Sequence, residues 1–265
     1  SNSATHAECA RCGVVFAKVQ WAPFDAAAAH GAGVEHPSDD RAHDPESAEW
    51  PRERWVRLCA VPCALLFAWA AVRGVPGPVR LLTMWVHETG HAVAAWFCGY
   101  AAFPGPWFTP VGSERSFFVT VLLLALIGGV AARAWREGRV AAAAAGAVAL
   151  VAALVGTFGL HPGQAEQVIV FSGDAGSFVL GAALMLTVYA SADSPLRADG
   201  LRWGLLPLGA LALMDVLLVW TGPFDALPFG ATDHGLSDPS VLAEMFGWSA
   251  LTLTRRYRML AGTCL

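Results

Sequence analysis

Residues 116–135 read SFFVTVLLLALIGGVAARAW, and this stretch decides the class of fold. It contains a single charged residue, Arg133. A helix of about 20 predominantly apolar residues is long enough to cross the hydrocarbon core of a bilayer. The stretch therefore predicts a membrane-spanning helix.

The composition of the whole chain indicates the same environment. Hydrophobic residues make up 55% of the 265 residues, charged residues make up 14%, and the mean hydropathy is +0.49. Typical soluble domains carry about 25% charged residues. The excess of apolar residues must face something other than water, and lipid is the simplest candidate. The net charge of −4 and the lack of a basic stripe indicate no nucleic-acid partner.

Further apolar stretches have the length of a span and are separated by loops rich in Pro, Gly and charge. We therefore expect an all-α fold: a polytopic membrane helix bundle of about six transmembrane helices with a short polar N-terminal tail. Six spans place both termini on one side of the membrane, and arginines beside the first span favour the cytoplasmic side. The expected spans are 57–74, 79–99, 116–135, 138–160, 167–190 and 202–221.

Two regions flank the bundle expected over 56–225. Residues 1–55 are small, charged and interrupted by Pro, which predicts a mostly flexible polar tail. Cys9 and Cys12 in this tail form a CxxC knuckle, but no second cysteine pair follows there, so metal binding by the knuckle stays open. Residues 226–265 predict a C-terminal loop and an interfacial helix over 239–253.

The second expected span contains the segment MWVHETGHAV, Met84 to Val93. Helical spacing puts His87 and His91 one turn apart on the same face. Two imidazoles so placed can bind one Zn²⁺ ion, and Glu88 can act as the general base, which is the HExxH arrangement of metallopeptidases. Ionisable residues at bilayer depth cost about 2.5–3.5 kcal/mol each and usually mark function. The alternative is a pair of core histidines bonded to neighbouring helices.

A catalytic zinc ion requires a third protein ligand and an open position. Two aspartates in later spans are candidates for this metal ligand, Asp174 in FSGDAGSF and Asp215 in LALMDVLLVW. Asp174 could instead cap a helix that begins at Ala175, and Asp215 could pair with an arginine. Asp174 is slightly preferred because the neighbouring glycines let helices and a metal approach closely.

The motif HETGH in a membrane span, followed by a distant intramembrane aspartate, resembles the site-2 protease family of intramembrane zinc metallopeptidases. The resemblance covers mainly residues 81–98 and implies that His87 and His91 bind zinc, that Glu88 is catalytic, and that Asp174 or Asp215 is the third ligand. The family has Leu-Asp-Gly at its second motif, whereas Met214 and Val216 flank Asp215 here. We therefore regard the chain as a divergent, bacterial-type relative.

This resemblance leads us to expect an integral protein of a bacterial inner (plasma) membrane, with the bilayer around it and a peptide or membrane protein as its substrate. We expect it to hydrolyse peptide bonds in or near the membrane, that is, to perform intramembrane proteolysis. One alternative is a catalytically inactive scaffold or assembly subunit that retains the zinc site, with membrane-protein partners still to be identified. Another is a metal transporter.

Two other segments have open interpretations. The stretch Gly99–Gly112 is rich in Pro and aromatic residues, and either packs as an interfacial loop or folds back near the metal and offers an edge strand to a substrate. The segment TDHGLSDP groups Asp233, His234 and Asp238, which predicts either a solvated loop or a second metal site.

Overall fold

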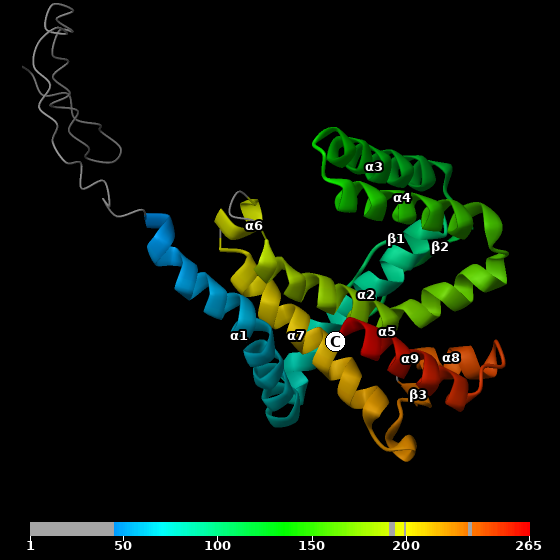
Figure 1. Ribbon diagram of the computed structural model, residues 1–265. Helices are drawn as coiled ribbons and strands as arrows, with labels where there is room; N and C mark the ends of the chain where they lie inside the picture. Colours follow the sequence, from blue (N-terminus) through cyan, green and yellow to red (C-terminus); the bar gives the residue numbers. More distant parts are fainter. Residues whose placement is uncertain (1–44, 191–193, 199, 233–234) are drawn as a thin grey trace, which may run out of the picture. The chain divides into compact units, whose positions relative to one another are not determined.

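The computed structural model describes residues 45–190, 194–198, 200–232 and 235–265, of which residues 49–265 belong to one compact unit. The Cys9/Cys12 knuckle, Asp233 and His234 lie outside the described residues. The fold is an all-α membrane helix bundle (Figure 1). Its long helices are α1 Pro45–Gly74, α2 Pro76–Phe97, α3 Phe117–Arg136, α4 Val140–Leu154, α5 Pro162–Leu186 and α7 Arg202–Thr221.

Within the part of the chain that the structure describes, five helical segments are long and apolar enough to cross a membrane, which indicates an integral membrane protein. They are Glu53–Gly74, Phe117–Arg136, Val140–Gly159, Pro162–Tyr189 and Arg202–Thr221. Two of these include short continuations, a π-helical turn η1 (Val155–Gly159) after α4 and a 3₁₀ turn η2 (Thr187–Tyr189) after α5. The second expected span, 79–99, corresponds to α2, which is not among the five. Arg80, His87, Glu88 and His91 lower the hydropathy of this helix.

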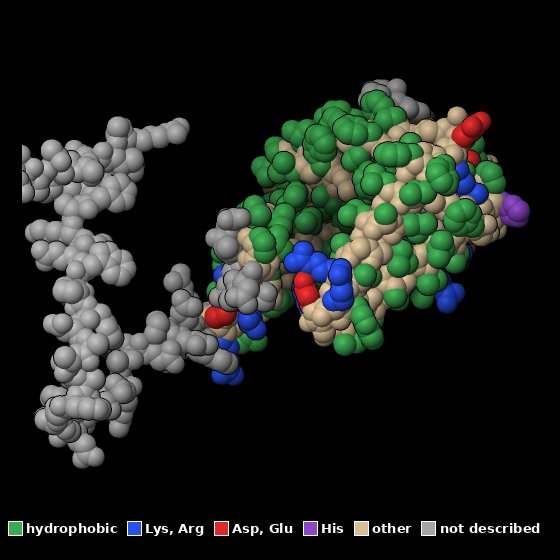
Figure 2. All heavy atoms as spheres, turned by 90° about the horizontal axis from the view of Figure 1, so that it is seen from above, with side chains coloured by type: hydrophobic (Ala, Val, Ile, Leu, Met, Phe, Trp, Pro, Cys, Tyr) green, Lys and Arg blue, Asp and Glu red, His purple; other side chains and the backbone are tan. Residues whose placement is uncertain are grey.

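Helices α3 and α4 form an antiparallel pair whose side chains are mostly exposed. Only Thr120 and Ala134 are buried on α3, although the helix is almost entirely apolar. Ser116 begins it, because its Oγ accepts a hydrogen bond from the Val119 N–H at 3.3 Å. Figure 2 shows hydrophobic side chains over much of the displayed face of the helical part. Such a surface suits contact with lipid rather than with water.

Helix α2 has clear local reasons for its boundaries. Proline stands at the start of its first turn, where the missing N–H costs no hydrogen bond. The helix ends before Gly99, whose φ of +83° favours glycine. The side chains of Thr157 and Thr120 also lie next to Gly99, so the chain leaves the helix through a narrow space.

Helices α2, α5 and α7 form the centre of the bundle by close glycine-mediated packing. A side chain at Gly90 on α2 would collide with the backbone of α5 at Ser172 and Gly176. On the other side of α5, Gly181 faces Gly209 on α7, and a Cβ at Gly209 would lie 2.5 Å from the Gly181 carbonyl oxygen. Small residues let membrane helices approach closely, and here they bring the polar face of α2 against α5.

The remaining elements surround this centre. Strands β1 (Tyr100–Ala102) and β2 (Val111–Arg115) form an antiparallel hairpin after α2. A short helix α6 (Pro195–Ala198) precedes α7. After α7 come a 3₁₀ turn η3 (Phe224–Ala226), a small hairpin of β3 (Ala231–Thr232) and β4 (Gly235–Leu236), and helices α8 (Asp238–Glu244) and α9 (Ala250–Cys264).

Two boundaries differ from those expected from the sequence. The helix expected over 239–253 is divided into α8 and α9, because Gly247 has a φ of +69° and the Ser249 side chain accepts a hydrogen bond from the Thr252 N–H and begins α9. At the other end of the chain, α1 begins at Pro45, within the region 1–55 expected to be a tail. Farther along α1, Glu53 lies 3.4 Å from the Arg202 guanidinium on α7.

Candidate metal centre

Helix α2 directs two imidazoles toward one point. His87 and His91 lie on the same face, and their Nε2 atoms are 3.2 Å apart. The two rings meet edge to face, with centroids 4.8 Å apart. The helical spacing predicted from the sequence is therefore present, and both Nε2 atoms face a shared cavity.

The opposite ring nitrogens are held by hydrogen bonds. Nδ1 of His91 lies 2.7 Å from the carbonyl oxygen of Ile169 on α5. Since a carbonyl can only accept, this Nδ1 donates its proton, which leaves Nε2 as the nitrogen of His91 that could bind an ion. Nδ1 of His87 lies 3.1 Å from Oδ1 of Asp174, also on α5. Metal-binding histidines are usually oriented by such carboxylate and carbonyl partners.

The aspartate that reaches both Nε2 atoms is Asp238, at the start of α8. Its Oδ2 lies 3.0 Å from Nε2 of His87 and 3.0 Å from Nε2 of His91. Three ligand atoms of a tetrahedral zinc ion with bonds of about 2.0–2.1 Å lie about 3.3–3.4 Å apart. The two nitrogens and this oxygen are thus nearly at ligand spacing, and the donor set of two imidazoles and one carboxylate suits zinc.

The position of Asp238 between the two imidazoles determines the pKa of its carboxyl group. Burial raises the pKa of its carboxyl group, but hydrogen bonds from His87 and His91, together with their charge, outweigh burial and lower the pKa below the ordinary value. Asp238 is therefore an ionised acceptor that pairs with the two imidazoles.

Gly173 on α5 leaves the space that an ion would need. A Cβ at this position would lie 2.5 Å from Nε2 of His91 and 2.6 Å from Nε2 of His87. Any larger residue would therefore crowd the point where the two imidazoles converge. Glycine at this position therefore leaves room for an ion between the two imidazoles.

Glu88 lies beside this point and is only 4% exposed. A carboxylate oxygen of Glu88 and one nitrogen of each histidine lie within 4.8 Å of one another, so this group could hold a metal ion. Oε2 of Glu88 lies 2.8 Å from the Thr109 hydroxyl, which is also 2.9 Å from the Glu88 carbonyl oxygen. Thr109 therefore fixes the Glu88 side chain next to the imidazoles.

The two aspartates expected as the third ligand line the same cavity but contact atoms other than the two Nε2 atoms. Asp174 lies inside α5 rather than at a helix start; it contacts the Nδ1 side of His87, and its Oδ2 accepts a hydrogen bond from the Trp220 indole at 2.8 Å. Asp215 lines the same cavity and accepts a hydrogen bond from the Thr83 hydroxyl at 2.7 Å. The sequence offers two signals for Asp238, the helix start Ser-Asp-Pro and the possible second metal site in TDHGLSDP, but neither indicates that Asp238 contacts His87 and His91.

The cavity around these residues has a volume of about 670 Å³. Its walls come from α2, α5 and α7, from the loop before β2 through Trp107, Phe108 and Thr109, and from Pro228 and Leu236 near the C-terminal end. The stretch Gly99–Gly112 thus folds back beside α2, as the interpretation that places it near the metal predicts. That it offers an edge strand to a substrate stays a prediction. All five residues of β2 are exposed.

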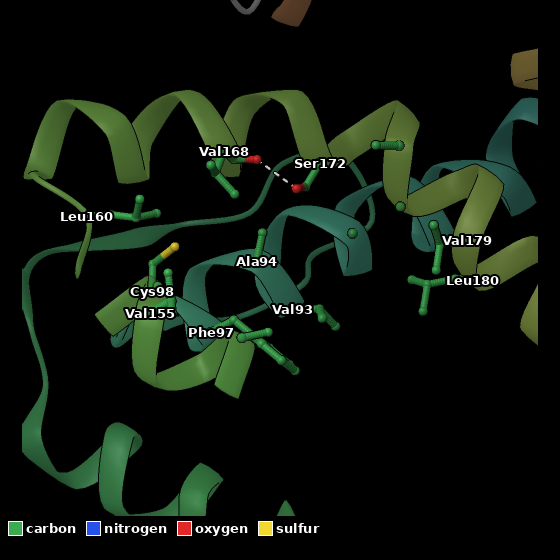
Figure 3. A pocket seen from close by; sticks show the side chains of 15 residues that line it. Val93, Ala94, Phe97, Cys98, Val155, Leu160, Val168, Ser172, Val179 and Leu180 are labelled. Atoms are coloured by element: carbon green, nitrogen blue, oxygen red, sulfur yellow. Dashed lines mark hydrogen bonds between the residues drawn. The ribbon is translucent and has the colours of Figure 1, made fainter. Parts of the chain in front are cut away.

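A second cavity of about 440 Å³ lies between α2, η1 and α5 and is lined by apolar side chains (Figure 3). Its polar lining residue Ser172 donates its hydroxyl to the Val168 carbonyl oxygen at 2.6 Å. The Cys98 thiol also lines it, and burial raises the pKa of that thiol. This cavity has no group arranged for chemistry, in contrast to the cavity at His87.

Comparison of the chain with protein-family models, with curated proteins and with solved structures gives no match.

Proposed function

We propose that this chain is a membrane-embedded zinc metallopeptidase, a hydrolase that cuts peptide bonds in or near the membrane. One observation carries the proposal: the Nε2 atoms of His87 and His91 converge 3.2 Å apart beside the buried carboxylate of Glu88. The resemblance of HETGH to the motif of the site-2 protease family supports the same function.

The roles of the residues follow from their positions. His87 and His91 would hold the ion, with Asp174 and Ile169 fixing the orientation of their rings. A zinc ion bound there would supply Lewis acidity and make a water molecule acidic near pH 7, with a pKa of about 7. Glu88, held by Thr109, would accept the proton of the attacking water and later deliver it to the leaving amine nitrogen. Asp215 has no assigned step.

A peptide segment would reach the site through the cavity between the β2 loop and the C-terminal residues. The aromatic side chains Trp107 and Phe108 on one wall suit apolar residues of a membrane protein substrate. We place the protein in a bacterial plasma membrane, with the N-terminal end of the first span in the cytoplasm because Arg54 and Arg57 lie at that end. Five crossings then put the C-terminal residues on the opposite side, whereas a crossing by α2 would return them to the cytoplasm.

The proposal is tested by asking whether the chain cleaves peptide bonds and whether that cleavage requires Glu88. The full chain and its Glu88→Gln variant are purified, reconstituted with a mixture of single-span membrane proteins in H₂¹⁸O, and new peptide termini are mapped by mass spectrometry. We expect ¹⁸O-labelled carboxyl termini with the parent chain and at least a hundredfold fewer with Glu88→Gln, since general-base catalysis contributes about 10²–10⁴-fold.

The matched control is Glu137→Gln, which removes an exposed acid at the turn between α3 and α4. It should leave both cleavage and zinc content unchanged. Cleavage that persists in Glu88→Gln would refute the mechanism. Bound zinc without any Glu88-dependent cleavage would refute peptidase activity and favour the scaffold function.

A further inference from the structure

We infer that Asp238 is the third protein ligand of the metal, and that the ion thereby fastens the C-terminal cap, residues 235–249, to the site helix α2. The inference depends on the metal-binding part of the proposed function and not on hydrolysis. It differs from what the motif resemblance implies, because Asp238 lies outside the five candidate spans.

The geometry distinguishes Asp238 from the other aspartates. Its Oδ2 is equidistant, at 3.0 Å, from the two Nε2 atoms that face the cavity. Asp174 contacts His87 at the other ring nitrogen, Nδ1, and so cannot share an ion with Nε2 of the same ring through that contact. Asp215 is engaged by Thr83, one turn of α2 before His87. Of the three aspartates, only Asp238 places a carboxylate oxygen next to both Nε2 atoms.

The position of Asp238 is defined by its own neighbours and does not depend on the histidines alone. Ser237 donates its hydroxyl to the Pro228 carbonyl oxygen at 2.6 Å, and its N–H bonds to the Gly230 carbonyl oxygen at 2.9 Å. Leu242 on α8 is fully buried in the core. The Trp248 indole donates to Oε1 of Gln167 on α5 at 2.8 Å. These contacts hold the Asp238 carboxylate beside α2.

The contacts of the cap are nevertheless few for a segment of this length. Helix α8 has seven residues, and only Pro239, Ser240 and Leu242 are buried on it. Short elements with few buried contacts open at low free-energy cost. Since an ion bound to both α2 and Asp238 stabilises only the closed arrangement, zinc should protect the cap against opening.

Binding of an ion by Asp238 would also affect the shape of the cavity. Leu236, Ser237, Asp238 and Pro239 all line it, so the cap forms one of its walls. An ion that holds Asp238 also holds this wall in place. The metal then has two roles in this chain, one at the histidines and one in closing the cavity beside them.

The experiment measures zinc affinity and backbone exchange, neither of which requires activity. The full chain is purified in detergent with Cys9→Ser and Cys12→Ser, so that the N-terminal knuckle does not contribute zinc. Zn²⁺ affinity is measured by competition with a chelating dye for Asp238→Ala, Asp238→His, Asp174→Asn and Asp215→Asn. Glu244→Gln is the matched control, an exposed acid on the same helix.

We expect Asp238→Ala to weaken zinc binding at least a hundredfold, because even outer-sphere partners of a metal ligand contribute about 10–100-fold. Asp174→Asn should weaken it less, within that outer-sphere range. Asp215→Asn and Glu244→Gln should bind like the parent, and Asp238→His should recover part of the loss by supplying a nitrogen ligand. Parent-like zinc affinity in Asp238→Ala, or a larger loss in Asp215→Asn, would overturn the assignment.

Hydrogen exchange read by mass spectrometry tests the fastening of the cap. Residues 235–249 should exchange at least tenfold more slowly with zinc than after chelation. Exchange in residues 117–154, which form α3 and α4, should not depend on zinc and serves as the control for an intact fold. In Asp238→Ala the cap should lose its zinc dependence. Equal exchange with and without zinc in the parent would refute the fastening. A parent that binds no zinc would refute both proposals, whereas zinc-dependent protection without cleavage would refute only hydrolysis.

Discussion

The glycine opposite the two histidines provides a sharp test of the metal centre. A Gly173→Ala substitution places a methyl group 2.5 Å from Nε2 of His91 and 2.6 Å from Nε2 of His87. Ordinary van der Waals contacts of a Cβ begin at 3.4 Å, so each nitrogen must withdraw by about 0.8–0.9 Å. Metal–ligand distances tolerate only about ±0.2 Å. The displacement is therefore about four times what a zinc site accepts.

We expect Gly173→Ala to weaken zinc binding at least a hundredfold, which corresponds to about 2.7 kcal/mol at roughly 1.4 kcal/mol per factor of ten. The measurement is competition with a chelating dye on the purified chain, with helix content followed by circular dichroism. Alanine favours a helix over glycine by about 1 kcal/mol, so lost helix propensity cannot explain a loss of zinc. The control is Gly163→Ala on the same helix, where a Cβ would meet nothing within 4 Å.

Parent-like zinc affinity in Gly173→Ala would refute the reasoning, because it would mean that no ion occupies the point between the two Nε2 atoms. An equal loss in Gly163→Ala would also refute it, because the effect would then belong to the helix and not to the site.

Two further substitutions test the base and the helix packing. Thr109→Val removes the hydroxyl that lies 2.8 Å from Oε2 of Glu88 and should lower Glu88-dependent cleavage about ten- to hundredfold, since a hydrogen bond to a charged group contributes about 1.5–3 kcal/mol. Thr109→Ser should retain the rate, and equal rates for both variants would contradict the role of Thr109. Gly209→Val inserts a side chain where a Cβ would already lie 2.5 Å from the Gly181 carbonyl oxygen, and should destabilise the bundle by about 1–3 kcal/mol in thermal unfolding followed by circular dichroism. Gly204→Val on the same helix has open space and should leave the melting temperature unchanged.

Several features of the bundle follow directly from local sequence. The apolar stretch 116–135 becomes α3, Phe117–Arg136, because length and hydropathy are properties of consecutive residues. The spacing of His87 and His91 likewise places both rings on one face of α2, since a helix turn is fixed by backbone geometry. Other boundaries depend on packing, and the division of the expected helix 239–253 at Gly247 was not predicted.

The sequence by itself determined a membrane helix bundle and the pair of imidazoles with an adjacent carboxylate, because both are encoded within single helices. Only the tertiary structure decided which aspartate faces that pair. Asp174 and Asp215 lie in apolar segments and are the natural candidates by sequence, yet Asp238, 151 residues after His87, is the one whose oxygen meets both Nε2 atoms. Which side chains meet across such a separation depends on how α5, α7 and the C-terminal cap pack around α2, and no local pattern specifies that packing.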